Sequence, residues 1–215
     1  MSVAYYIGAN TGRHCEDFSK VYDKVIAIEP NPVSYDKLVD RCKNIKNVIC
    51  INKAVSNSKK SIDFFIPDNP MKSEVATCNM SWVEGKFKRV FDEGYSKIEV
   101  SSTTLKELFS THGEPNLIKL DVEGYERPII ETLEKKYIGC KVIFEWSSEL
   151  RIDAARCLQH LEKLGWGACQ ILRGDNPINL SGDFRDWMSM YDGMVYLLKH
   201  PTPKISGEWG DVYAT

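Results

Sequence analysis

The feature that most constrains the fold is a series of short apolar runs separated by segments with helical spacing. Four runs have the length of a strand, and three carry acids near their carboxyl ends: Val3–Ile7, Lys24–Glu29, Asn116–Gly124 and Lys141–Trp146. Continuous apolar runs are typical of strands buried on both faces. The alternation predicts an α/β, Rossmann-like fold with a mostly parallel sheet and helices on both faces. Right-handed crossovers would gather the strand carboxyl ends at one edge, where such folds bind ligands.

The remaining elements are expected between and after these runs. Asn31 and Pro32 suit the cap and the first turn of a helix. Ser61–Pro67 alternates in polarity and predicts an added antiparallel strand, with Lys97–Leu105 as its partner. The other expected elements are a third strand at Asn47–Val55, helices at Glu126–Lys136 and Asp153–Gly165, and last strands in "ACQIL" and at Gly193–Leu198.

The length of the chain bounds its domain organisation. A chain of 215 residues can bury one core, so we expect residues 1–215 to form a single domain, either complete or excised from a longer chain. The longest stretch without clear periodicity is 68–95. Long irregular loops in compact domains are usually functional, and we interpret this one as a substrate-side loop or lid.

Composition excludes several classes of function. The net charge is −2 with both signs mixed along the chain, which argues against nucleic acid as a partner. No segment is apolar and long enough to span a membrane. Seven scattered cysteines, without zinc spacing to the four histidines, favour reduced thiols in a cytoplasmic protein.

The first predicted strand runs into a glycine turn, "GANTG", and the second ends on Glu29. Small residues let a ligand approach the backbone, and the helix that follows offers free amide donors. An acid about twenty residues later suits the hydroxyls of a ribose. Because Asn10 stands where a dinucleotide fingerprint has its middle glycine, the pattern favours another nucleoside, such as S-adenosylmethionine.

Five motifs in order resemble the FkbM-type methyltransferases, which use S-adenosylmethionine: "IGANTG", "AIEPNPVSYDKL", "INKAVSN", "STTLKEL" and "IKLDVEGYE". The resemblance implies a class I methyltransferase fold and methyl transfer to an oxygen, often of a sugar or a secondary metabolite. Tyr6 departs from it, because the family usually has an aspartate there that helps arrange the methionine end of the cofactor. The cofactor-binding residues expected on this basis are Gly8, Ala9, Asn10, Thr11, Gly12, Glu29, Pro30, Asn31, Ala54, Val55, Ser56 and Asp121.

Methyl transfer to a hydroxyl calls for a base, because an aliphatic hydroxyl is a very weak acid. Carboxylates at the strand ends are the available groups. Asp121 is the first candidate for base or for substrate orientation, Glu145 is the second, and Glu123 shares a side of the strand with Asp121. Two such acids could also hold a divalent cation, but nothing in the spacing demands one, so no metal ligand is assigned.

Aromatic residues near the predicted edge point to the acceptor. Trp82, Tyr125 and Trp146 could stack on the apolar face of a sugar, in a pocket expected to be rich in aromatics and uncharged. We therefore expect an O-methyltransferase for a small-molecule or glycan hydroxyl, fused to or working with glycosyltransferase domains. Two alternatives stay open: methyl transfer to a non-sugar secondary metabolite, and a degenerate cofactor-binding or glycan-binding module without catalysis.

Overall fold

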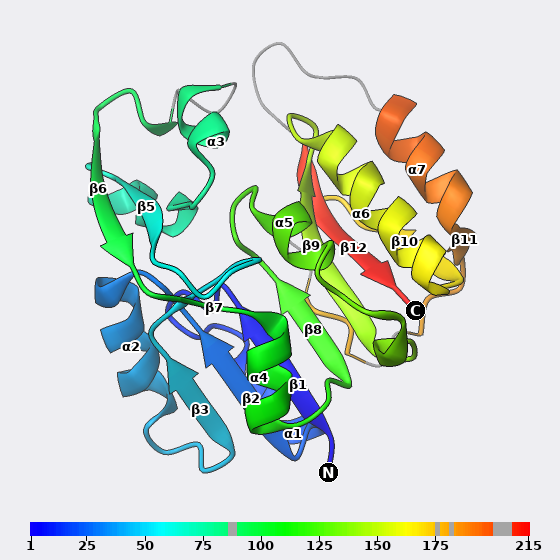
Figure 1. Ribbon diagram of the computed structural model, residues 1–215, viewed down its shortest axis with the longest axis horizontal. Helices are drawn as coiled ribbons and strands as arrows, with labels where there is room; N and C mark the ends of the chain where they lie inside the picture. The colour runs from blue at the N-terminus through cyan, green and yellow to red at the C-terminus, as the bar shows by residue number, and fades with distance from the viewer. Residues whose placement is uncertain (86–89, 175–176, 181–182, 200–207) are drawn as a thin grey trace.

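The computed structural model describes residues 1–85, 90–174, 177–180, 183–199 and 208–215. Its central sheet has eight strands in the order β11-β10-β12-β9-β8-β1-β2-β3 (Figure 1). The five strands from β9 to β3 run parallel: β1 (Val3–Ile7), β2 (Lys24–Ile28), β3 (Val48–Ile51), β8 (Leu117–Leu120) and β9 (Lys141–Ser147). The predicted α/β class with a mostly parallel sheet is confirmed.

Three antiparallel strands complete the sheet beyond β9: β12 (Trp209–Ala214), β10 (Ala168–Ile171) and β11 (Met188–Ser189). Two sequence-based expectations fail here. Gly193–Leu198 is not a strand but part of helix α7 (Met190–Lys199), and the last strand, β12, was not foreseen. Gly193 lets α7 pack tightly, since a Cβ there would lie 2.4 Å from the Cys169 sulfur.

Alternating residues of the central strands pack on opposite faces of the sheet. Tyr5 and Ile7 join a core with α4 (Leu105–His112), α5 (Glu126–Ile130), α6 (Arg151–Leu164) and α7. Ala4 and Tyr6 join a second core with α1 (Cys15–Val21) and α2 (Pro32–Cys42). The strands read as continuous apolar runs because helices cover both faces of the sheet.

Local capping explains where several helices begin. Asn31 caps α2 by accepting a hydrogen bond from the Val33 amide, and Pro32 opens the helix, as expected. The helix predicted from Glu126 to Lys136 is shorter: α5 ends at Ile130, and a 3₁₀ turn, η3 (Lys135–Tyr137), follows.

The third predicted strand divides where the chain leaves the sheet. After β3, the side-chain amide of Asn52 donates to the Glu29 carbonyl, and β4 (Ala54–Val55) pairs instead with β7 (Ser102–Thr103). The expected antiparallel pair is present as β5 (Ile62–Pro67) and β6 (Tyr95–Val100).

The stretch predicted as a lid holds two short helices, η1 (Pro70–Val75) and α3 (Met80–Glu84). We call residues 68–85 and 90–95 the lid segment; positions 86–89 of the predicted lid lie outside the described residues. The segment lies with β5 and β6 beyond the carboxyl ends of β1, β2 and β8 (Figure 1). None of the helices in the described part of the chain has the length and apolar character needed to cross a membrane.

Candidate active site

A cavity of about 660 Å³ opens at the carboxyl ends of the parallel strands, beneath the lid segment. The turns after β1, β2, β8 and β9 form its floor, and the lid segment and β12 form its walls. Thirteen residues expected from the sequence line it: Gly8, Ala9, Asn10, Thr11, Glu29, Pro30, Ala54, Val55, Trp82, Asp121, Glu123, Tyr125 and Glu145.

The glycine turn after β1 lies against the turn after β8. Gly8 has a φ of +79°, and a Cβ there would sit 1.8 Å from the carbonyl oxygen of Asp121. The amides of Gly8 and Ala9 both donate to the Ile28 carbonyl at 2.9 Å. Only glycine allows this close approach, which brings the two turns together on the cavity floor.

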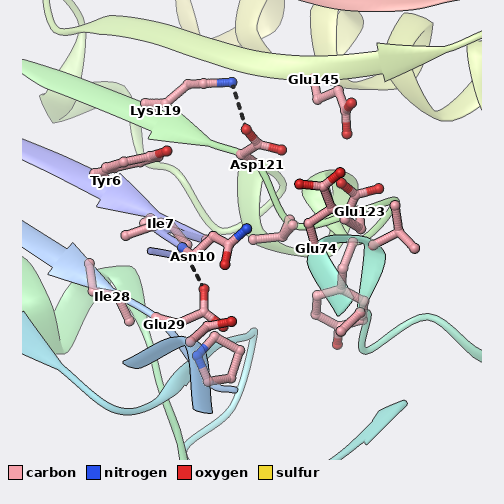
Figure 2. Close-up of a pocket in the computed structure, with 18 of the residues that line it drawn as sticks. Tyr6, Ile7, Asn10, Ile28, Glu29, Glu74, Lys119, Asp121, Glu123 and Glu145 are labelled. Atoms are coloured by element: carbon pink, nitrogen blue, oxygen red, sulfur yellow. Dashed lines mark hydrogen bonds and ion pairs between the residues drawn. The ribbon is translucent and has the colours of Figure 1, made fainter. Parts of the chain in front are cut away.

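Glu29 joins this turn to the start of α2. One carboxylate oxygen accepts a hydrogen bond from the Asn10 backbone amide at 2.8 Å (Figure 2). The other accepts from the Asn31 backbone amide, also at 2.8 Å. Burial raises the pKa of Glu29 to about 7, although the two amide donors act in the opposite direction. Each oxygen keeps a further lone pair, so the carboxylate could also accept two ribose hydroxyls.

Three carboxylates meet at the other end of the cavity. The side-chain oxygens of Asp121, Glu123 and Glu145 lie within 4.8 Å of one another, and Glu74 of the lid segment lies beside them (Figure 2). Burial, followed by repulsion between these acids, raises the pKa of Glu123 and of Glu145 well above the ordinary value. Such a cluster could accept a proton, bind hydroxyl groups or hold a divalent cation.

A buried lysine forms an ion pair with one acid of this cluster. Lys119 is 3% exposed; its Nζ donates to Asp211 of β12 at 2.7 Å and forms an ion pair with Asp121 at 3.5 Å. Burial alone would lower the pKa of Lys119, but the carboxylates of Asp121 and Asp211 raise it well above the ordinary value. The neighbouring Tyr6, in register with Lys119, is also buried, and burial raises the pKa of its hydroxyl.

The lid segment contributes part of the wall and is tied to the turn after β8. The Thr77 hydroxyl donates to the Glu123 carbonyl at 2.8 Å, and the Asn79 side-chain amide donates to the Gly124 carbonyl at 2.7 Å. Trp82 is almost fully buried and packs over Gly124.

Four residues expected in the site do not line the cavity. Gly12 packs beside Leu38, and Asn31 caps α2. The Ser56 hydroxyl bonds to the Ser58 carbonyl. Trp146 points into the core, where its indole nitrogen donates to a backbone carbonyl at 3.0 Å. All four support the structure around the cavity.

Several residues that line the cavity were not predicted from the sequence: Glu74, Lys119, Trp209 and Asp211. Lys119 carried a signal, because a charge inside a strand buried on both faces needs a partner. Trp209 and Asp211 belong to the unforeseen strand, and Trp209 is 45% exposed at the cavity. With these acids, the pocket is not uncharged, contrary to the expectation from the sequence.

The sheet order, the glycine turn after β1 and the buried acid after β2 are those of a Rossmann-like domain that binds a nucleoside at the carboxyl ends of its parallel strands. A family model, the methyltransferase FkbM domain, matches residues 7–188. The chain therefore belongs to the FkbM methyltransferase family, and its cofactor is S-adenosylmethionine.

Solved structures similar to this chain include methyltransferases. Precorrin-6y C5,15-methyltransferase from Geobacter metallireducens GS-15 is 12% identical over 99% of this chain and 80% of its own, with a TM-score of 0.49. Aeropyrum pernix fibrillarin, crystallised with S-adenosylmethionine, is 10% identical over 100% of this chain and 66% of its own, with a TM-score of 0.47. A search of the curated proteins found no match.

Proposed function

We propose that this methyltransferase transfers a methyl group to a hydroxyl oxygen of a sugar or glycan. The observation that carries the proposal is the carboxylate cluster of Asp121, Glu123 and Glu145, which faces the same cavity as the buried Glu29. The cavity therefore has one end suited to a nucleoside and one end suited to removing a proton.

The first end fits the cofactor. Glu29 would hold the ribose hydroxyls, and Ala54 and Val55 would border the adenine. The turn from Gly8 to Thr11, which has no room for a side chain at Gly8, would lie along the methionine portion. S-adenosylmethionine supplies an electrophilic methyl group on a positively charged sulfur, and carboxylates nearby favour that charge.

The second end fits the acceptor. A hydroxyl held beside Asp121 forms its new bond to the methyl carbon as the carbon–sulfur bond breaks, and a carboxylate takes the hydroxyl proton. Asp121 is the candidate base, while Glu123 and Glu145, with their raised pKa, bind neighbouring hydroxyls or share the proton. Lys119 keeps Asp121 oriented through the ion pair.

The sugar acceptor is supported by the character of the wall. Trp82, Tyr125 and the half-exposed Trp209 offer aromatic surface for the apolar face of a sugar ring. The acids offer hydrogen-bond acceptors for several hydroxyls at once, which suits a polyol better than a simple alcohol.

The test uses labelled S-adenosylmethionine and a panel of glycosides with varied hydroxyl configuration, with non-sugar alcohols as a second panel. We expect a mass gain of one methyl on a glycoside, and a fall in kcat of about two to four orders of magnitude in Asp121→Asn. Glu16→Gln, an exposed acid on α1, is the control and should match the wild type.

Other outcomes separate the alternatives. Methylation confined to the non-sugar panel would move the acceptor class to another metabolite. Binding of S-adenosylhomocysteine without transfer to any acceptor would favour a non-catalytic module. Unchanged turnover in Asp121→Asn would remove that residue as the base.

A further inference from the structure

The turn that carries Glu123 has an unusual backbone. Glu123 has a φ of +53° and Gly124 a φ of +89°, so two consecutive residues occupy the left-handed region. A residue with a side chain seldom adopts this conformation, and it persists where the surrounding structure holds it. The contacts that hold this turn therefore determine where the Glu123 carboxylate points.

One set of contacts comes from the start of α5. A carboxylate oxygen of Glu126 accepts hydrogen bonds from the amides of Val122, at 3.0 Å, and Gly124, at 3.4 Å. Glu126 is only 7% exposed, so these bonds are shielded from water. This set belongs to the turn's own chain segment and does not depend on the lid segment.

The second set comes from the lid segment, 45 or 46 positions earlier in the chain. Thr77 donates its hydroxyl to the Glu123 carbonyl, and Asn79 donates its side-chain amide to the Gly124 carbonyl. Thr77 is fully buried, and its backbone pairs in both directions with Phe65 of β5. Asn79 also caps α3 by accepting from the Ser81 amide. The lid segment is thus anchored to β5 and bonded directly to the turn.

The two donors do not line the cavity, although their neighbours do. Ala76, Cys78 and Trp82 face the cavity, whereas Thr77 and Asn79 turn toward the backbone of the turn. An acceptor in the cavity would touch the lid segment and Glu123 at once. Any effect of Thr77 or Asn79 on that acceptor must therefore pass through the position of the turn or of the lid segment.

We infer that Thr77 and Asn79 are positioning residues that couple acceptor docking against the lid segment to the orientation of Glu123. This inference rests on the proposed function, because it takes the Glu123 end of the cavity to be the acceptor end. The Glu29 end is held by different contacts, to Asn10 and Asn31, and stays outside the coupling.

Conservative variants test the coupling. Thr77→Val removes the hydroxyl and keeps the volume, while Thr77→Ser keeps the hydroxyl. Asn79→Ser keeps a good helix cap but cannot reach the Gly124 carbonyl. Asn69→Ser is the matched control, because Asn69 caps η1 in the same segment and has no hydrogen bond to the turn.

The measurements separate the acceptor from the cofactor. For Asn79→Ser we expect kcat/KM for the glycoside methylated in the panel to fall about tenfold, the effect of one lost buried hydrogen bond. The fall should be at least as large for Thr77→Val, which also removes the acceptor of the hydrogen bond from the Asn79 backbone amide. Affinity for S-adenosylhomocysteine, measured by calorimetry, should stay within about twofold, as for a distant independent site. Thr77→Ser and Asn69→Ser should match the wild type in both measurements.

Each remaining result overturns a distinct statement. Wild-type acceptor kinetics in both Thr77→Val and Asn79→Ser would overturn the coupling, as would equal losses for acceptor and cofactor. If Thr77→Val does not fold, Asn79→Ser decides alone. A wild-type chain that binds no S-adenosylhomocysteine contradicts the proposed function itself, before any variant is compared.

Discussion

At the scale of single residues, Glu29 carries both a structural and a binding role. Its carboxylate accepts the Asn10 and Asn31 amides, so it fixes the glycine turn to α2 whether or not a cofactor is bound. Its pKa of about 7 means that it changes charge near neutral pH. Since only the ionised carboxylate can accept hydrogen bonds at every lone pair, cofactor binding should depend on pH.

We expect the affinity for S-adenosylhomocysteine to rise as the pH increases from about 6 to about 8, because ribose hydroxyls favour the ionised form of Glu29. Calorimetry across this range measures the effect. Glu29→Gln should bind more weakly, by about tenfold or more, since a charge-assisted hydrogen bond is lost. The variant should also lose the pH dependence, and a variant that kept the wild-type slope would contradict the assignment.

The close approach of the two turns at Gly8 can be tested by comparison with another glycine of similar backbone conformation. Gly8 and Gly174 have φ values of +79° and +71°. A Cβ at Gly8 would meet the Asp121 carbonyl oxygen, whereas a Cβ at Gly174 would meet no atom of the described residues within 4 Å. Gly174→Ala should cost about 1 kcal/mol of unfolding free energy from the backbone alone. Gly8→Ala should cost clearly more, about 3 kcal/mol, in urea denaturation. Equal losses in the two variants would show that the close approach of the turns is not tight.

At the scale of elements, the sequence predicted the strands and helix starts that depend on residues close together in the chain. The parallel strands were foreseen because burial on both faces requires a continuous apolar run. The helix caps were foreseen because capping favours particular residue types at the start of a helix. "GMVYLL" has the β-branched and aromatic content of a strand, yet α6 and Cys169 provide the surface on which it packs as α7. Tertiary packing overrode propensity there, and no short window of sequence contains that information.

An ion pair between Lys119 of β8 and Asp211 of β12 links two strands that β9 separates in the sheet. Lys119→Met should destabilise the protein by about 3 kcal/mol, because the partly buried carboxylates of Asp211 and Asp121 lose the buried lysine with which they pair. Adding Asp211→Leu should restore part of that stability, since an apolar pair can replace a buried ion pair. Urea denaturation of both variants measures this difference, and a single variant as stable as the wild type would contradict a structural role for the pair.

At the scale of the whole molecule, the two ends of the cavity differed in how far the sequence predicted them. The Glu29 end lies within one βαβ unit. In such a unit the number of residues between the glycine turn and the acid is enough to predict that the two lie close together. The acceptor end is assembled from β8, β9, β12 and the lid segment, which only the tertiary structure brings together. Asp121, Glu123 and Glu145 were foreseen as strand-end acids, while Glu74 and Asp211 had no local signal.

Gathering so many acids at one site has a cost in stability that depends on pH. Burial is the main cause of the raised pKa of Glu29 and Glu126, each to about 7, and it also raises the pKa of Glu145 well above the ordinary value. The folded state therefore holds protons that the unfolded state has already released above about pH 4.5. Because these acids bind more protons in the folded state, they make stability fall as the pH rises through this window, by about 1.4 kcal/mol per pH unit for each proton.

We therefore expect the unfolding free energy of the cofactor-free protein to be highest on the acid side of neutrality and to decrease toward pH 8. Glu126→Gln keeps an acceptor for the Val122 amide but cannot ionise, so its stability should fall less steeply and should exceed that of the wild type above about pH 7. Glu16→Gln is the control. The Lys20 hydrogen bond lowers the pKa of Glu16, so this acid has no proton left to release in the window. Urea denaturation at a series of pH values measures the three slopes. A wild-type stability that rises between about pH 5 and pH 8 would contradict the raised pKa of these acids and the penalty for ionising them in the folded state.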